Sequence, residues 1–235
     1  PEKCHACGAC ATQCRFDAIH PHAGVYQIDP LSCEGCKRCV QTCRFGAILW
    51  EERNCGTWLE SSTRQGTLFH ARLDPGAENS GKLVSLVREK ARERAIQEKI
   101  PVILMDGPPG IGCPAIASLT GVHYALLVTE PTPAGHHDLM RILELVKHFQ
   151  VHASLLLNKA DLDDRYRQKI QEAMAENHVP IVGEIPFSPL FSEAQFHGQS
   201  IIEAFPDAEE SQHLRAAIKN WLRIISESQH QRSIS

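Results

Sequence analysis

The chain has 235 residues, of which 43% are hydrophobic, and a net charge of −4 at pH 7. This length allows one or two domains, and the apolar content is enough for a sizeable core. The slightly acidic balance gives no electrostatic reason to expect nucleic-acid binding. No run approaches the roughly 18 consecutive apolar residues of a membrane span, and the sequence does not open with a charged-then-apolar signal segment. We therefore expect a cytoplasmic protein with neither a nucleic-acid nor a membrane partner.

Eight of the ten cysteines lie near the start of the chain, in two runs of identical spacing. The steps between successive cysteines are three, three and four residues in both runs. The first run comprises Cys4, Cys7, Cys10 and Cys14, and the second comprises Cys33, Cys36, Cys39 and Cys43. The flanks repeat as well, because residues 14–19 read Cys-Arg-Phe-Asp-Ala-Ile and residues 43–48 read Cys-Arg-Phe-Gly-Ala-Ile. The pattern indicates a duplicated binding unit.

This spacing is typical of iron–sulfur ligation. Three thiolates at i, i+3 and i+6 on a tightly coiled loop can bind three irons of one cubane, and in two-cluster ferredoxins the fourth cysteine of a run ligates the other cluster. We therefore assign two [4Fe–4S] clusters, each bound by three cysteines of one run and the last cysteine of the other. Cluster 1 is assigned to Cys4, Cys7, Cys10 and Cys43, and cluster 2 to Cys33, Cys36, Cys39 and Cys14.

Three other interpretations of the cysteines remain open at this point. Zinc sites usually use paired C-x-x-C sequences and often include histidine, whereas these runs are triplets plus a fourth cysteine. A disulfide framework requires an oxidising compartment and is usual in short secreted chains. The third interpretation is a purely structural module that has lost its clusters. The spacing favours clusters over all three, and thiols of this kind indicate a reducing compartment.

Arginine stands where bacterial ferredoxins usually have proline after the fourth cysteine. Arg15 and Arg44 each place a positive charge beside a cluster, so we expect a modest rise in reduction potential. We expect Phe16 and Phe45 to pack over the clusters and to exclude water. Because fewer than about sixty residues cannot bury much apolar surface, metal ligation is expected to supply much of the folding energy of this module.

The first predicted strands lie in and just after the cysteine module. Residues 25–28 and 47–50 are predicted to pair as a small hairpin, with one strand from each repeat. Residues 51–80 are polar and contain glycine, and we expect a connection there with one or two strands, the best candidate being residues 68–73.

From residue 81 the sequence alternates between amphipathic helices and apolar runs. Helices are predicted around residues 83–96, 139–146, 170–174 and 214–225, and strands at residues 102–105, 124–128, 154–157 and 181–185. Near-continuous apolar strands between such helices predict an α/β fold whose mostly parallel sheet is covered on both faces. In such folds ligands bind beyond the carboxyl ends of the strands. Those ends carry Asp106, Glu130, Asn158 and Pro186.

Two polar segments at these strand ends indicate a nucleotide site. Asp106 follows an apolar strand and suits a Walker B role, in which it holds Mg²⁺ directly or through water. The turn from Gly107 to Gly110 suits a switch loop that responds to a γ-phosphate. Residues 158–161, Asn-Lys-Ala-Asp, suit a base-recognition loop in which the amide of Asn158 pairs with a purine edge. The alternative for Asp106 is a helix cap or a turn residue.

The one candidate phosphate loop departs from the pattern that phosphate binding requires. A P-loop reads G-x-x-x-x-G-K-[ST], whereas residues 76–83 read Gly-Ala-Glu-Asn-Ser-Gly-Lys-Leu. Leu83 therefore stands in place of the hydroxyl that would bind Mg²⁺. We interpret Lys82 as a false match, at a helix N-terminus that Asn79 or Ser80 caps.

Taken together, these motifs resemble the MinD/ParA-type P-loop ATPases, a superfamily with CobQ/CobB relatives, in the form that carries an inserted two-cluster ferredoxin domain. The resemblance covers nearly the whole chain and rests on residues 4–48, 67–73, 78–84, 106–110, 158–159 and 183–187. It implies an incomplete P-loop NTPase fold of the MinD/SIMIBI type with a small ferredoxin-like α+β domain. It also implies that Asp106 acts on Mg²⁺ and Asn158 on adenine, and that the nucleotide site includes Lys159, Pro186, Gly107 and Gly110.

In that family the phosphate loop, of the G-K-G-G-x-G-K-T type, lies upstream of the cysteines. This sequence opens three residues before the first ligand, so we expect either a fragment or truncated product, or a chain that binds no ATP by itself. Mg-ATP is expected only when the upstream segment is present. The resemblance implies an ATPase, but we expect this chain to be inactive alone. A sheet without its central strand is expected to expose an apolar slot.

We expect three parts: a two-cluster ferredoxin-like domain at residues 1–55, a nucleotide-binding α/β domain at residues 56–228, and a disordered tail at residues 229–235. The expected function is ATP-linked electron transfer or metallocluster maturation. The alternatives are a nucleotide-independent ferredoxin-type electron carrier and an iron–sulfur cluster assembly scaffold. The expected partner is a redox or metallocluster protein, with a homodimer as a further option.

The remaining cysteines and the last helix carry simpler predictions. Cys55 and Cys113 are predicted to be buried, inert thiols, with redox sensing as the alternative for Cys113. The last helix is predicted to dock on the sheet and to present Arg215, Lys219 and Arg223 on its polar face. Binding to a membrane surface is the alternative for this helix.

Overall fold

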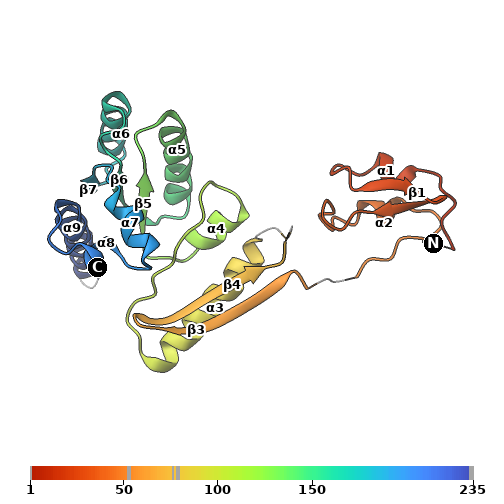
Figure 1. The fold of residues 1–235 in the computed structure, drawn as a ribbon, viewed down its shortest axis with the longest axis horizontal. Coiled ribbons are helices and arrows are strands. Elements are labelled where there is room, and N and C mark those ends of the chain that lie inside the picture. Colours follow the sequence, from red (N-terminus) through yellow and green to blue (C-terminus); the bar gives the residue numbers. More distant parts are fainter. Residues whose placement is uncertain (1, 52–53, 76, 78–79, 233–235) are drawn as a thin grey trace. The chain divides into compact units, whose positions relative to one another are not determined.

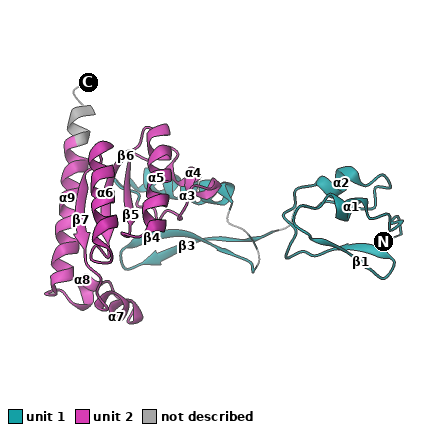
Figure 2. Cartoon of the chain, turned by 90° about the horizontal axis from the view of Figure 1, so that it is seen from above, with its two compact units in different colours: residues 1–103 teal, residues 104–235 magenta. Residues whose placement is uncertain are grey.

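The structure is a computed structural model that describes residues 2–51, 54–75, 77 and 80–232 (Figure 1). The chain divides into two compact units, residues 1–103 and residues 104–235 (Figure 2). The first unit begins with the cysteine module, and the second contains the parallel sheet.

The cysteine module contains two short helices and one hairpin. They are α1 (Ala9–Thr12), β1 (Ile19–His22), β2 (Val25–Ile28) and α2 (Arg38–Thr42). β2 confirms a predicted strand, but its predicted partner at residues 47–50 is wrong, because β2 pairs antiparallel with β1. Ala23 and Gly24 both have positive φ, the backbone conformation that a two-residue hairpin turn requires. The local turn therefore selects the neighbouring strand as the partner.

A long hairpin and a helix complete the first unit. They are β3 (Gly56–Thr63), β4 (Gly66–Leu73) and α3 (Gly81–Glu98). The predicted strand at residues 68–73 and the predicted helix are confirmed. Ser80 caps α3, because its hydroxyl accepts a hydrogen bond from the backbone N–H of Leu83 at 3.3 Å. Gly76 and Asn79 of the candidate phosphate loop lie outside the described residues.

The second unit is built on a three-stranded parallel sheet in the order β5-β6-β7. Its elements are α4 (Cys113–Leu119), β5 (Tyr124–Thr129), α5 (Pro133–His148), β6 (His152–Asn158), α6 (Asp164–Glu176), β7 (Ile181–Ile185), α7 (Leu190–Phe196), α8 (Ile201–Ala204) and α9 (Glu209–Arg232). The three strands and the helices α5, α6 and α9 confirm the predicted α/β alternation. Periodicity did not predict α4, α7 and α8, because four to seven residues are too few to show a helical repeat.

Helices cover both faces of this sheet (Figure 1). On one face α5 and α6 contribute to the apolar core, whose most buried side chains are Leu143, Leu155, Leu157, Ile170 and Met174. On the opposite face α9 approaches β7 so closely that a Cβ built at Gly183 would lie 2.6 Å from the Cβ of Ala217. The side-chain amide of Asn220 also donates a hydrogen bond to the carbonyl of Val182 at 3.1 Å. The predicted docking of the last helix on the sheet is confirmed.

One predicted strand is wrong. Residues 102–105 are not part of a strand, and Val102 and Leu104 are 72% and 82% exposed. A β-strand requires a hydrogen-bonded neighbour, and this apolar run has none among the described residues. At the other end α9 continues to Arg232, and residues 233–235 of the predicted tail lie outside the described residues, so the tail stays a prediction. In the part of the chain that the structure describes, no helix has the length and apolarity needed to cross a membrane.

Candidate metal centre and strand-edge site

The cysteine module has almost no apolar interior. Among its described residues 2–51, only Ala18 and Ile19 are buried hydrophobic residues, at 1% and 5% exposure. All eight cysteines of the two runs are free thiols. Because so little apolar surface is buried, another source of folding energy is needed, and metal ligation can supply it.

The cysteines assigned to cluster 1 affect one another's pKa. Hydrogen bonds from backbone N–H groups, first that of Tyr26, lower the pKa of the Cys4 thiol, while the nearby Cys43 thiolate opposes this effect. Burial raises the pKa of the Cys10 thiol, and the Cys4 and Cys7 thiolates raise it further. The last cysteine of the second run is thus near enough to Cys4 to affect its pKa, and the crossed ligation pattern stays a prediction.

The cysteines of the second run form a similar neighbourhood. Burial raises the pKa of the Cys39 thiol, and the Cys33 and Cys36 thiolates raise it further. The fourth cysteine of each run also accepts the same kind of hydrogen bond within its own repeat. The sulfur of Cys14 accepts a hydrogen bond from the backbone N–H of Ala18 at 3.4 Å, and the sulfur of Cys43 accepts the same bond from the residue four positions on, also at 3.4 Å.

The backbone follows the duplication too. Residues with left-handed backbone conformation occupy the same places in both repeats. The matched pairs are Ala6 and Gly35, Gly8 and Lys37, and Asp17 and Gly46, with φ between 48° and 75°. In each pair one repeat has glycine and the other does not. The loop shape is therefore set by the repeat and not by glycine alone.

The donor set fits iron–sulfur clusters. It offers eight thiols in two neighbourhoods, and backbone N–H groups that donate to sulfur, a feature that tunes cluster potential. Four thiols from each predicted set would hold one cluster. Across the described residues, no three His, Cys, Asp or Glu side chains are arranged to hold a single metal ion.

The aromatic and cationic neighbours of the clusters are at the surface. Phe16 and Phe45 are 44% and 45% exposed, and the ring of Phe45 lies 4.2 Å from that of His5. Arg15 and Arg44 are also exposed. The covering of the clusters by the two phenylalanines stays a prediction.

The two other cysteines are exposed, so the prediction that Cys55 and Cys113 are buried is wrong. Cys55 lies just before β3, and Cys113 is the first residue of α4. Both positions are ends of elements, where side chains lie outside the packed core.

In the second unit, the ends of β6 and β7 form one connected edge. Asn158 pairs in register with Ile185. The N–H of Ala160 donates to the carbonyl of Ile185 at 2.9 Å, and the N–H of Phe187 donates to the carboxylate of Asp161 at 2.7 Å. These bonds bring the predicted base-recognition loop and the segment after Pro186 together, as the sequence predicted for a shared site.

The end of β5 joins the same edge through an ion pair. The ammonium group of Lys159 lies 2.7 Å from the carboxylate of Glu130, and both side chains are 37% exposed. Lys159 has φ of 49°, so the chain turns sharply after β6. Thr132 caps α5 by accepting a hydrogen bond from the N–H of Gly135 at 3.0 Å. The edge therefore joins the ends of all three strands.

Asp106, Gly107 and Gly110 lie on an irregular segment before α4. Gly110 has φ of 79°, a left-handed conformation that suits glycine. Asp106 is exposed, and within the described residues no hydrogen bond or ion pair joins it to the loop of Asn158 and Lys159. The structure thus joins three of the six predicted nucleotide residues and leaves these three apart.

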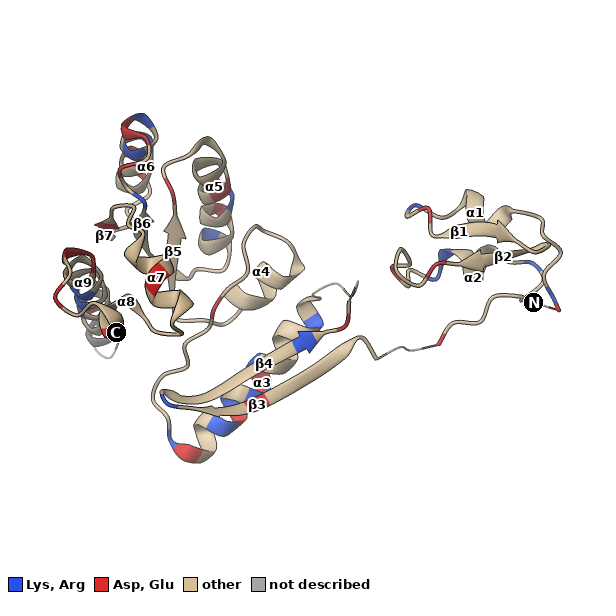
Figure 3. Cartoon of the chain, in the orientation of Figure 1, with Lys and Arg blue, Asp and Glu red and all other residues tan. Residues whose placement is uncertain are grey.

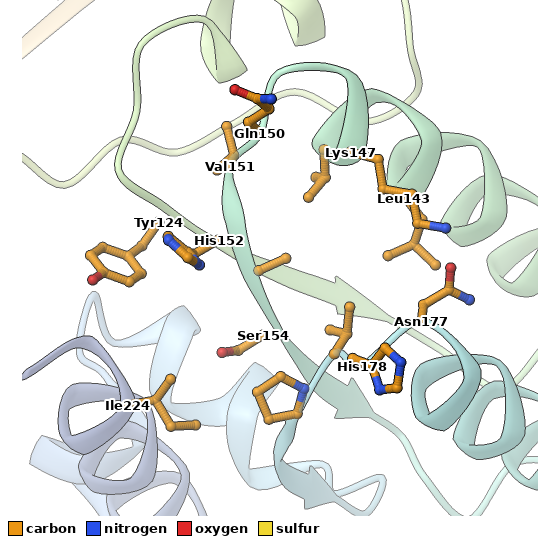
Figure 4. A pocket seen from close by; sticks show the side chains of 14 residues that line it. Tyr124, Leu143, Lys147, Gln150, Val151, His152, Ser154, Asn177, His178 and Ile224 are labelled. Atoms are coloured by element: carbon orange, nitrogen blue, oxygen red, sulfur yellow. The ribbon is translucent and has the colours of Figure 1, made fainter. Parts of the chain in front are cut away.

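A pocket of about 320 Å³ lies elsewhere in this unit (Figure 4). Its wall includes Tyr124 and His152, the first residues of β5 and β6, together with His178 and Ile224. It opens at the amino ends of the strands and contains none of the predicted nucleotide residues. Since ligands of open α/β sheets bind at the carboxyl ends, we assign it no role in nucleotide binding.

Comparison with known protein families identifies the cysteine module. The family described as 4Fe-4S binding domain matches residues 1–20 and 26–49, one match for each cysteine run. The chain carries a 4Fe-4S binding domain. This match supports 4Fe-4S cluster binding over a zinc site or a disulfide framework.

The curated relatives of the chain come from Methanocaldococcus jannaschii. Uncharacterized protein MJ0578 is 34% identical over 163 residues, which are 69% of this chain and 56% of the relative. Uncharacterized ATP-binding protein MJ0547 is 22% identical over 128 residues, 53% of this chain and 48% of the relative. The chain spans about half the length of the curated relatives it matches.

Solved structures show the fold of the chain. MinD cell division protein from Aquifex aeolicus superposes with a TM-score of 0.52 at 16% identity and covers 69% of this chain and 68% of its own. The cell division ATPase MinD of Pyrococcus furiosus gives 0.50 at 15% identity, with 92% and 74% covered. The expected MinD/ParA-type α/β fold is confirmed.

Some contacts of the chain could not be predicted from its sequence. The pairing of Glu130 with Lys159 had only a weak signal, since each follows a predicted strand. The bond between Asp161 and the N–H of Phe187 had none, because a carboxylate in an Asn-Lys-x-Asp loop is expected to face the base. The stacking of Lys37 on Trp50 also had no signal.

Proposed function

We propose that the protein holds two [4Fe–4S] clusters and couples electron transfer or metallocluster maturation to ATP. The observation that supports this proposal is the cysteine module itself, in which eight free thiols in two runs coincide with only two buried apolar residues among the described residues 2–51. The 4Fe-4S family match over both runs supports the same proposal. When bound, such clusters supply one-electron chemistry.

The residues of the chain hold and tune the thiolates in this proposal. N–H groups donate to the sulfurs of Cys4, Cys14 and Cys43, which stabilises the thiolate form. Arg15 and Arg44 place positive charge next to the last cysteine of each run, which favours the more negative, reduced state. Each effect raises the reduction potential.

The link to ATP rests on the second unit. We propose that Asn158 reads adenine beside Lys159 and Pro186 at the connected strand edge, and that Asp106 acts on Mg²⁺ next to Gly107 and Gly110. The MinD-type fold and the ATP-binding protein among the relatives support this proposal. We expect Mg-ATP to bind a polypeptide that also supplies a Walker A loop ahead of the cysteines.

A nucleotide-independent electron carrier of the ferredoxin type is the second candidate. It is favoured by the division of the chain, because the cysteine module and the strand edge belong to different compact units. A cluster-assembly scaffold is the third possibility, and it predicts transfer of a cluster to an apo acceptor.

Anaerobic potentiometry followed by EPR separates these functions. The chain and a longer polypeptide with a Walker A segment are reduced with and without Mg-ATP. ATP-linked function predicts that the potential or the EPR spectrum of the longer polypeptide changes with Mg-ATP and that the chain alone does not respond. Reversible one-electron reduction without any nucleotide effect in either protein supports the ferredoxin-type carrier and contradicts the coupling to ATP.

A further inference from the structure

The two halves of the cysteine module differ at one matched position. The residue before α1 is Gly8, and the residue before α2 is Lys37; both have left-handed backbone, with φ of 75° and 64°. The next residue is Ala9 in the first repeat and Arg38 in the second. The second repeat therefore carries two positive charges where the first carries none (Figure 3).

Each half has an aromatic side chain over its cysteine loop. In the first repeat a Cβ at Gly8 would lie 3.0 Å from the hydroxyl oxygen of Tyr26, so a side chain there would require Tyr26 to shift. In the second repeat the indole nitrogen of Trp50 lies 3.9 Å from the Cβ position of Gly35. Trp50 therefore covers the loop that carries Cys36, as Tyr26 covers the matched loop.

Lys37 and Trp50 contact each other directly. The ammonium nitrogen of Lys37 lies 3.6 Å from the centroid of the Trp50 ring, a cation–π geometry. Lysine is unfavourable in a left-handed conformation, and this contact offsets part of that cost. It also holds a positive charge in a fixed position over the loop of cluster 2.

The surroundings of this contact are exposed and unpaired. Trp50 is 41% exposed and Leu49 is 82% exposed. Lys37 and Arg38 are exposed, and neither forms an ion pair with another described residue. We call Lys37, Arg38, Leu49 and Trp50 the Lys37–Trp50 surface. It combines an aromatic and an aliphatic side chain with two cations that form no ion pair among the described residues, the composition of a docking site for a protein of opposite charge.

We propose that the Lys37–Trp50 surface docks an acidic redox protein at cluster 2. The inference rests on the proposed binding of clusters by this module. The chain as a whole has a net charge of −4, so it repels an acidic partner except where cations gather. The surface thus orients such a partner with its carboxylates on Lys37 and Arg38, beside the cysteines of the second run. Cluster 2, when bound by these cysteines, would exchange one electron with the redox centre of the partner.

Small oxidants of opposite charge test this inference on the cluster-loaded chain. The reduced chain is mixed anaerobically with anionic Fe(III)-EDTA or with cationic hexaamminecobalt(III). One electron leaves the protein in each case and reduces Fe(III) to Fe(II) or Co(III) to Co(II). The variant K37G/R38A replaces both cations with the uncharged residues, glycine and alanine, that the first repeat has at the matched positions. The control K147A/K219A removes the same charge from exposed helix positions in the second unit.

The inference predicts that K37G/R38A slows oxidation by Fe(III)-EDTA roughly tenfold relative to hexaamminecobalt(III) at low ionic strength, and that the effect fades in high salt. The control keeps the wild-type ratio, and K37R/R38K restores it. An unchanged ratio in K37G/R38A, or an equal drop in the control, overturns the inference. If the wild-type chain contains neither iron nor sulfide, the proposed function is contradicted instead, so failure of the docking inference can be told apart from failure of the proposed function.

Binding of a labelled acidic peptide gives a readout that does not depend on electron transfer. Fluorescence anisotropy of a fluorescein-labelled deca-glutamate peptide is measured with the cluster-loaded chain at low salt. The wild type and the control are expected to bind it, and K37G/R38A is expected to lose at least about tenfold in affinity. If single-stranded DNA of equal charge binds this surface more tightly than the peptide, the assignment to an acidic protein is wrong.

Discussion

The carboxylate of Asp161 accepts a hydrogen bond from the backbone N–H of Phe187 at 2.7 Å. The bond joins the loop after β6 to the segment after β7, and these two strands are consecutive in sequence and adjacent in the sheet. Asp161 is therefore a positioning residue for the strand edge. In this role it fixes the distance between Asn158 and Pro186, on which the proposed adenine site depends.

Replacement of Asp161 tests this role. Asp161→Ala removes the acceptor and is expected to lower the free energy of unfolding by no more than about 1 kcal/mol, since the bond is exposed to solvent. Asp161→Asn keeps an acceptor oxygen and is expected to retain most of the stability. Urea unfolding measures both. In a polypeptide that binds nucleotide, Asp161→Ala should weaken the binding of ATP and of GTP to the same extent. A selective loss of GTP would instead mean that Asp161 reads the base.

The close approach of β7 and α9 at Gly183 gives a second prediction. In Gly183→Ala the new Cβ would lie 2.6 Å from the Cβ of Ala217, so α9 must move away from the sheet. Such overpacking is expected to cost about 1–3 kcal/mol of unfolding free energy. Ala217→Gly in the same chain removes the clash and is expected to recover part of that loss. Thermal unfolding of the single and double variants checks this, and an unaffected Gly183→Ala would contradict the packing.

Glu184 joins β7 to α6 through two side chains. Its carboxylate lies 2.6 Å from the guanidinium of Arg167 and accepts a hydrogen bond from the amide of Gln171, also at 2.6 Å. Glu184 is 24% exposed and Arg167 is 41% exposed. Because the site is only partly shielded from water, Glu184→Ala is expected to cost about 1–2 kcal/mol, less at high salt.

Glu172 provides the matched control for Glu184. Its carboxylate accepts a hydrogen bond from Gln168 at 2.8 Å on the exposed side of α6. Glu172→Ala is therefore expected to change the unfolding free energy by no more than about 0.5 kcal/mol. Equal effects of the two substitutions in urea titrations would show that the network of Glu184 adds no stability.

Removal of iron should affect the two units differently. Only Ala18 and Ile19 are buried hydrophobic residues among the described residues 2–51, whereas the second unit has an apolar core built on Leu155, Leu157 and Ile170. An anaerobic chelator is expected to unfold the cysteine module and to leave the second unit folded. Amide hydrogen exchange with mass spectrometry resolves the two. Full protection of the module after iron loss would contradict metal-driven folding.

The sequence predicted elements well where burial alone decides the structure. β5, β6 and β7 were predicted because a strand covered on both faces is apolar throughout. Residues 102–105 have the same pattern but form no strand, since pairing depends on neighbours that are distant in sequence. β1 was missed because His20, Pro21 and His22 show no apolar alternation, and only the turn at Ala23 and Gly24 creates the hairpin.

The cysteine spacing predicted the class of cofactor because ligand geometry constrains local sequence. The strand edge was predicted only in part. Asn158, Lys159 and Pro186 meet because parallel strands end at one edge. Two contacts could not be predicted from the periodicity of the sequence, because each depends on one particular side chain. They are the ion pair of Lys159 with Glu130 and the hydrogen bond from the N–H of Phe187 to Asp161.

The central claim is that the two cysteine runs bind two four-iron clusters. Iron and acid-labile sulfide, counted per chain in an anaerobically prepared sample, test it most directly. The account predicts about eight of each, falling to about half when Cys7 and Cys10 are both replaced by alanine. A colourless preparation that contains zinc, or neither iron nor sulfide, would contradict it.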